Sequence, residues 1–186
     1  MLKGERVTLR AVERDDLKRL HELQRNVDLV LLGDGEWQPQ PLAAREQWFD
    51  KHVLDEDKAW FVIEVDGTLI GDLNLHHRDR RSRVSAFGIA IYDPAYLGQG
   101  YGREAIGLLL DWAFRIQNYE RIWLDTWANN QRALRCYKSL GFVEEGRQRR
   151  HLFVNGEYID VVLMGLLRDE WEAGRSQGQG DKETRR

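Results

Sequence analysis

The chain has 186 residues, of which 42% are apolar, and its formal net charge is −3 from 28 basic and 31 acidic residues. This length fits one domain, and the near balance of charges argues against nucleic-acid binding. No apolar run approaches the length of a membrane span, and a single cysteine excludes an intramolecular disulfide. We therefore expect a cytoplasmic protein with neither a membrane nor a nucleic-acid partner.

The first half of the chain combines strand and helix patterns. Apolar residues alternate with polar ones in RVTLRAV, and Leu17, Leu20 and Leu23 recur at helical spacing. The pair Asp66–Gly67 is typical of a hairpin turn. The predicted elements are a strand at 6–12, a helix from Asp15 or Asp16, a Gly- and Pro-rich loop at 31–41, a helix at 42–53, and strands at 59–65, 68–77 and 84–92.

The second half begins with a glycine-rich loop and a long helix, whose apolar stripe is Ile106, Leu109, Leu110, Ala113 and Phe114. A strand at 121–127, a short helix capped by Asn129 or Asn130 and ended by Gly141, and a hairpin around Asn155–Gly156 follow. The order of elements predicts one α+β domain over 1–172. The polar tail at 173–186 is predicted to be disordered.

The stretch YLGQGYGREA, residues 96–105, places glycines at 98, 100 and 102 between a strand and a helix. A loop without side chains lets a ligand approach the backbone, and the amides of a helix N-terminus attract anions. The loop is therefore a candidate phosphate site, although an ordinary turn has the same composition. The spacing is neither the GxGxxG of a dinucleotide fold nor a P-loop, because no Gly-Lys-Ser/Thr follows.

Two segments, YDPAYLGQGYGREAIGLLLDWAF and NNQRALRCYKSLGFVEEG, resemble the GNAT family of N-acetyltransferases. The resemblance covers about residues 5–168 and is strongest to ribosomal-protein N-terminal and spermidine N-acetyltransferases. It implies a GNAT fold, with a central mixed and mostly antiparallel sheet flanked by helices and two strands splayed at the acetyl-CoA site. It also implies acetyl-CoA as co-substrate, a primary amine as acceptor (a protein N-terminus, a polyamine or an amino sugar) and a possible homodimer.

The resemblance assigns the cofactor site residue by residue. The acyl chain of CoA is expected along a strand edge, the pyrophosphate on the glycine loop, and the pantetheine arm near an asparagine. The residues so assigned are Ala90, Ile91 and Tyr92, then Leu97, Gly98, Gln99, Gly100, Tyr101, Gly102 and Arg103, and Asn130. Leu97 stands where the family usually has Gln or Arg, so we expect weaker affinity, offset in part by Arg103.

The resemblance also implies the leaving-group acid. Ala133, Tyr137, Gly141 and Phe142 match the family pattern Ala-x-x-x-Tyr-x-x-x-Gly-Phe, in which the tyrosine protonates the departing sulfur. A phenol with a pKa of about 10 stays protonated at neutral pH. The alternative role for Tyr137 is that of a packed aromatic. The neighbouring Cys136 is expected to point elsewhere and to serve packing.

The general base stays open. Related polyamine acetyltransferases often carry a glutamate where this chain has Phe87. The candidates are Asp34, Glu36, Asp72, His76, His77, Asp125 or a water relay. Adjacent histidines on a strand point to opposite faces, so at most one of the pair faces the cleft, a metal site is not expected, and a structural role is favoured for each.

Two functions are therefore compatible with the sequence. The first is direct transfer of acetyl from acetyl-CoA to an amine within a ternary complex. The second is a non-catalytic acetyl-CoA-binding sensor or interaction module, because Leu97 and Phe87 both depart from the active pattern.

Overall fold

The computed structural model describes the backbone of residues 1–33 and 37–183, with side chains as far as Arg175. Its strands form one sheet in the order β1-β2-β3-β4-β5-β6-β8-β7, in which the pairs of described strands run antiparallel except for the parallel pair β5–β6. The strands are β1 (Leu2–Lys3), β2 (Val7–Ala11), β3 (Ala59–Val65), β4 (Thr68–Asp79), β5 (Val84–Ile91), β6 (Arg121–Trp127), β7 (Val143–Val154) and β8 (Glu157–Leu167). The predicted mixed and mostly antiparallel sheet is confirmed.

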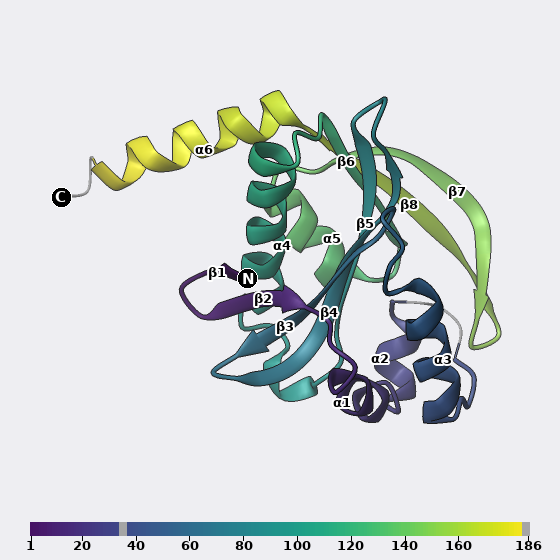
Figure 1. Ribbon diagram of the computed structural model, residues 1–186. Coiled ribbons are helices and arrows are strands. Elements are labelled where there is room, and N and C mark those ends of the chain that lie inside the picture. Colours follow the sequence, from purple (N-terminus) through teal and green to yellow (C-terminus); the bar gives the residue numbers. More distant parts are fainter. Residues whose placement is uncertain (34–36, 184–186) are drawn as a thin grey trace.

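Helices cover both faces of this sheet (Figure 1). They are α1 (Asp16–Leu23), α2 (Val27–Leu31), α3 (Leu42–His52), α4 (Tyr101–Asp111), α5 (Gln131–Ser139) and α6 (Arg168–Glu183), with a 3-10 turn at Pro94–Tyr96 and a π-helical turn at Trp112–Ile116 that continues α4. The three helices α1, α2 and α3 lie together at one end of the sheet, on one of its faces. Helix α4 lies against the other face of the sheet.

The apolar residues of the central strands enter two buried cores, one on each face of the sheet. Val62, Leu69 and Tyr92 belong to a buried cluster with the side chains of α1 and α3. Ile63 and Ile70 belong to a second, larger cluster with the apolar stripe of α4. Successive strand residues point to opposite faces, so neighbouring apolar residues of β3 and β4 enter different cores.

The parallel strands β5 and β6 separate after a short pairing. The register joins Val84–Ala86 to Arg121–Trp123. Beyond it β5 continues to Ile91 along β4, and β6 continues to Trp127 along β8. Among the described residues, the two strands therefore share no further pairing, and their diverging ends leave backbone edges facing each other, as the predicted splay requires.

The predicted first loop is preceded by a short helix. Its first residue, Leu31, ends helix α2, which begins at Val27 and is capped by Asn26, whose Oδ1 accepts a hydrogen bond from the Leu29 amide at 3.3 Å. Such a cap satisfies an amide that the helix itself leaves unpaired, and a five-residue helix is too short for periodicity to predict it. Two candidate bases in this loop, Asp34 and Glu36, lie outside the described residues.

The chain beyond β8 begins with helix α6. Helix α6 continues through Glu183 and projects away from the sheet (Figure 1). Its first turn is anchored by Trp171, which is buried and lies 5.1 Å from the Phe114 ring. Arg175 stacks on Trp171 and forms an ion pair with Asp111. The start of α6 is therefore anchored by residues of α4 and the π-helical turn, and disorder of the tail stays a prediction.

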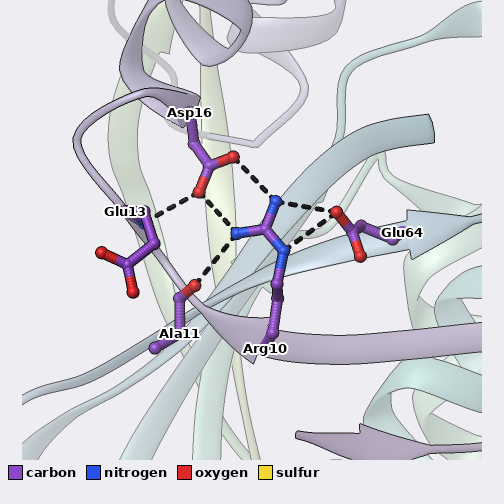
Figure 2. A network of polar contacts seen from close by, with 5 residues as sticks. All are labelled: Arg10, Ala11, Glu13, Asp16 and Glu64. Atoms are coloured by element: carbon purple, nitrogen blue, oxygen red, sulfur yellow. Dashed lines mark hydrogen bonds and ion pairs between the residues drawn. The ribbon is translucent and has the colours of Figure 1, made fainter. Parts of the chain in front are cut away.

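Arg10 joins β2, β3 and the start of α1 (Figure 2). Its guanidinium bonds both carboxylate oxygens of Asp16, at 2.7 and 2.8 Å, and Glu64 Oε1 at 2.7 Å. Burial opposes ionisation of Asp16, but the hydrogen bonds from Arg10 and from the Glu13 amide prevail and lower its pKa. The network therefore stabilises the junction between β2, β3 and the start of α1.

We expect Arg10→Met to lower the free energy of unfolding by about 2–3 kcal/mol at pH 7, because two carboxylates lose their shared cation. A folded-state pKa below the unfolded value stabilises above the unfolded pKa, about 3.9, and that stability is lost as pH falls through the lowered pKa. The difference from wild type should shrink at pH 3. Urea unfolding at both pH values measures it.

The matched control is Arg14→Met, which removes an exposed partner of Asp50. Exposed pairs contribute less than about 1 kcal/mol. An equal loss for the Arg10 variant at pH 7 and pH 3 would contradict the electrostatic explanation and assign the effect to the packing of the Arg10 stem.

Candidate active site

A cleft of about 1270 Å³ crosses the sheet where β5 and β6 diverge. On one side it is lined by the glycine loop, the start of α4 and one face of α5, and on the other by α3 and the ends of β3 and β4. The predicted cofactor residues line this cleft with one exception. The residues that line it are Ala90, Ile91, Tyr92, Leu97, Gly98, Gly100, Tyr101, Gly102, Arg103 and Asn130, together with Tyr137.

The edge of β5 offers alternate backbone groups to the cleft. The Tyr92 amide donates to the Ile70 carbonyl of β4 at 3.1 Å, so the N–H of Tyr92 is already used by the sheet. Antiparallel pairing alternates, so Ala90 faces β4 in the same way. Ile89 and Ile91 consequently direct their N–H and C=O groups toward the splay. Of the three predicted edge residues, Ile91 has the backbone orientation that a ligand needs.

The glycine loop has two left-handed positions. Gly98 has φ 72° and Gly100 has φ 89°, conformations that residues with a Cβ rarely adopt. Gly100 is the N-cap of α4, and no side chain of the described residues caps that end. The first amides of α4 are therefore available to an anion. Gly102 has no such backbone requirement; a Cβ there would lie 3.5 Å from Ile91 Cδ1.

Arg6, which no sequence motif indicates, holds the glycine loop from outside the cleft. Its Nη1 donates to the Gln99 carbonyl at 3.1 Å, and its guanidinium lies 4.7 Å from the centre of the Tyr101 ring. Glu104 accepts hydrogen bonds from the amides of Arg6 and Val7 at 2.8 and 3.0 Å. These contacts fix the loop against β2, ninety residues away in sequence, so no local motif could have indicated them.

Gln99 is the exception among the predicted cofactor residues. Its carbonyl is the acceptor for Arg6, and its side chain bonds the Ala95 carbonyl. It is not among the described residues that line the cleft. The structure thus places Gln99 in the support of the loop.

Tyr137 lies deep in the cleft on α5. Its side chain is 8% exposed, and its ring contacts Phe87 edge-on, with centroids 5.9 Å apart. Burial is the largest cause that raises the pKa of Tyr137, followed by the nearby Cys136 and Asp125. The phenol therefore stays protonated at any working pH and can donate its proton. Phe87 occupies the position expected for a glutamate and supports this ring instead.

The rest of α5 presents amide, thiol and cationic groups to the same side of the cleft. Asn130 Oδ1 caps the helix through the Ala133 amide at 3.1 Å, and its Nδ2 donates to the Leu32 carbonyl at 3.0 Å. Cys136 lines the cleft, so the expectation that it points elsewhere was wrong. Burial raises the pKa of its thiol, which keeps it protonated. Three arginines also line this side: Arg103, Arg132 and Arg135.

A row of polar side chains on β4 lines the opposite side. Asp72, Asn74 and His76 alternate with the fully buried Leu73 and Leu75. Polar residues at every second position share one face of a strand. The alternation in DLNLH was visible in the sequence and would have indicated that the polar face meets a cleft.

Trp60 of β3 lies beside this row and is hydrogen-bonded to Asp72. Trp60 Nε1 donates to Asp72 Oδ2 at 2.7 Å, and the Asp72 side chain is buried. Asp125 lines the cleft from β6. Two carboxylates thus face a space that has an aromatic wall, which suits a cationic amine.

The two histidines are not on opposite faces. His77 has φ 50°, and the pairing of β4 with β5 is irregular between His76 and Asp79, so strand alternation is interrupted there. The two rings are 5.0 Å apart. His76 lines the cleft, whereas His77 stacks on Trp123 and is not among the described residues lining it. The expectation that at most one histidine faces the cleft is confirmed, for a different reason.

The described residues also lack two features, a metal site and a membrane-spanning helix. Among them, no group of three or more His, Cys, Asp or Glu side chains converges so that it could hold a metal ion. In the same part of the chain, no helix combines the length and the apolar character needed to cross a membrane.

Comparison with known proteins identifies the family. The family model of the acetyltransferase (GNAT) domain matches residues 6–143, and the chain therefore belongs to the GNAT acetyltransferase family. The spermidine N(1)-acetyltransferase of Escherichia coli K12 is 31% identical over 170 residues, which cover 90% of this chain and 89% of that protein. The Vibrio cholerae spermidine N(1)-acetyltransferase is 34% identical over 169 residues, with 89% and 95% coverage.

A crystal structure of the Vibrio cholerae enzyme in complex with CoA and spermine superposes with a TM-score of 0.84 at 33% identity, covering 90% of this chain and 99% of that one. The chain is an acetyl-CoA-dependent N-acetyltransferase that acts on amines, as predicted. The fold family, the enzyme class and the co-substrate are confirmed, and the non-catalytic alternative is not favoured.

Proposed function

We propose that the acceptor is an aliphatic polyamine. The observation that carries this proposal is the likeness, over about nine-tenths of the chain, to proteins named spermidine N(1)-acetyltransferase. The cleft supports it, because Asp72 and Asp125 can attract ammonium groups while Trp60 provides an apolar wall for methylene segments. A protein N-terminus and an amino sugar become competing outcomes of the test.

The two sides of the cleft suit the two substrates. Acetyl-CoA would bind on the α4 and α5 side, with its pyrophosphate on the amides that follow Gly100 and near Arg103. The acyl arm would lie along β5, and the Ile91 N–H, which faces the splay, would bond the thioester oxygen as negative charge develops on it. The polyamine would enter from the side of Asp72 and Trp60, and its terminal nitrogen would reach the thioester through the splay.

Tyr137 is proposed to protonate the sulfur. When the amine attacks the acetyl carbon, the C–N bond forms and the C–S bond breaks, and the departing thiolate takes the phenol proton. The buried and protonated phenol suits this role, because it sits on the α5 side beside the expected path of the acyl arm.

The experiment is release of CoA thiol from acetyl-CoA with a panel of amines. The panel contains spermidine, spermine, glucosamine, an aminoglycoside, and short peptides with free Ser or Ala termini. We expect saturable turnover with the polyamines and kcat/KM at least tenfold lower with the others. Preference for a peptide or a sugar would contradict the polyamine assignment. Binding of acetyl-CoA without turnover of any amine would contradict the enzyme itself.

We infer no assembly beyond the predicted homodimer, which stays a prediction. One structure of the Vibrio cholerae enzyme is described as dodecameric. Analytical ultracentrifugation of this chain, with and without spermidine, measures the number of copies directly.

A further inference from the structure

His76 lies on the acceptor side of the cleft, where the splay opens. Its ring is half-buried, and its Cε1 is 3.8 Å from the position that a Cβ on Gly88 would occupy. The residue before Gly88 is Phe87, which packs against Tyr137. Successive residues of β5 point to opposite faces, so His76 and Tyr137 approach the same point of β5 from the two sides of the sheet.

Asn74 orients the His76 ring. The Nδ1 atom of His76 is 2.8 Å from Asn74 Oδ1, and both residues line the cleft. An amide oxygen can only accept, so Nδ1 carries the hydrogen in this bond. In the neutral imidazole, Nε2 is then the atom with the free lone pair. Asn74 therefore selects the tautomer in which Nε2 can take up a proton.

The surroundings keep His76 neutral. Burial is the largest cause that lowers its pKa, and His77 on the same strand and Lys58 before β3 act in the same direction. Asp125 on β6 opposes them. The neighbouring β5 positions carry no charge, since Ala86 is paired with His76 and Gly88 follows two residues on. A pKa below the ordinary value of about 6.5 leaves the imidazole unprotonated at neutral pH.

We propose that His76 is the general base that deprotonates the acceptor ammonium, an inference that rests on the proposed transfer to a polyamine. Nε2 takes one proton from the ammonium and passes it to solvent, which leaves a neutral amine. The amine attacks the acetyl carbon and the thiolate takes the Tyr137 proton. The second nitrogen proton returns through solvent to the phenolate. The products are the amide, CoA thiol and one released proton.

The other described candidates suit this role less well. The Asp72 carboxylate already accepts the Trp60 indole N–H, which holds it against β3. Asp125 lies on β6, where its charge favours the transient imidazolium. His77 stacks on Trp123 instead of lining the cleft. His76 therefore combines a position at the cleft, a free lone pair on Nε2 and the basicity of a neutral imidazole.

The test is the pH dependence of spermidine acetylation by His76→Gln. We expect kcat at pH 7 to fall about 100-fold or more, which is the usual contribution of a general base. The kcat/KM of the variant should rise about tenfold per pH unit up to pH 9, because the free fraction of an amine of pKa about 10 rises in that way. Wild type should be nearly flat over this range and lose activity only below the His76 pKa.

Two variants complete the design. His77→Gln is the matched control, and its kcat should stay within threefold of wild type. Asn74→Asp places a carboxylate at Nδ1 and favours the imidazolium, so the pKa of His76 should rise and the acidic limb of kcat should move to higher pH. If His76→Gln fails to bind acetyl-CoA, the shift of the acidic limb of the kcat–pH profile in Asn74→Asp decides whether His76 is the general base.

The outcomes separate the two proposals. If wild type acetylates spermidine and His76→Gln has the same kcat and pH profile, His76 is not the general base. The proposed polyamine function then remains intact. An acidic limb that does not move in Asn74→Asp overturns the proposed base as well. Absence of turnover with every amine by wild type overturns the proposed function and, with it, the base.

Discussion

Replacing Tyr137 with phenylalanine is expected to lower kcat about 100- to 1000-fold while leaving acetyl-CoA affinity within twofold, as for the loss of a general acid. The Tyr137 ring is held by Phe87 and Phe142, at centroid distances of 5.9 and 6.1 Å, so phenylalanine keeps this packing. Only the hydroxyl is lost, and with it the proton for the sulfur. Because the pKa of the phenol is raised, wild type should show no alkaline loss of kcat from this group below pH 10.

Steady-state kinetics and calorimetric titration with acetyl-CoA measure the two quantities separately. The matched control is Tyr119→Phe, which removes another buried hydroxyl, one bonded to Arg78 Nε. Tyr119 is not among the described residues that line the cleft, so its loss should change stability and leave kcat alone. A Tyr137→Phe enzyme with unchanged kcat would remove the phenol from the mechanism and make Tyr137 a packing residue.

Gly100→Ala is expected to weaken acetyl-CoA binding at least tenfold. With φ at 89°, a Cβ on this residue strains the backbone by about 1–2 kcal/mol and meets Arg6 Nη2 at 3.2 Å. The loop would relieve the strain by turning its amides away from the anion position at the start of α4. Since 1.4 kcal/mol corresponds to a factor of ten, strain of this size is sufficient for the predicted loss.

Gly67→Ala provides the comparison. Gly67 has φ 76° and open space around its Cβ position, and it lies in the β3–β4 turn away from the cleft. Both variants carry a similar backbone cost, so thermal unfolding should show similar destabilisation. Calorimetric titration should show weaker acetyl-CoA binding for Gly100→Ala alone. Equal affinities in the two variants would contradict the role of the loop as the pyrophosphate site.

The sequence by itself determined most of the secondary structure and one half of the site. Alternation and helical spacing are local properties, so the strands at 59–65 and 121–127 were predicted with the bounds that the structure shows. The glycine loop was indicated because a phosphate-binding turn is encoded by residues close together in the chain, and Tyr137 was indicated by the resemblance of its helix to the GNAT pattern. The acetyl-CoA side of the cleft is therefore largely a local feature.

Only the tertiary structure decided which side chains lie together on the proposed acceptor side of the cleft. Arg6 reaches Gln99 across 93 residues, and Trp171 at the start of α6 packs against Phe114 in the π-helical turn. The irregular β4–β5 pairing after His76 keeps His77 from the opposite face of the strand, which alternation along one strand does not reveal. Contacts of this kind depend on how distant segments pack, and packing is set by the whole core and not by any short pattern. For this protein, the sequence indicated the candidate cofactor loop and the candidate acid, whereas the fold selected the candidate base.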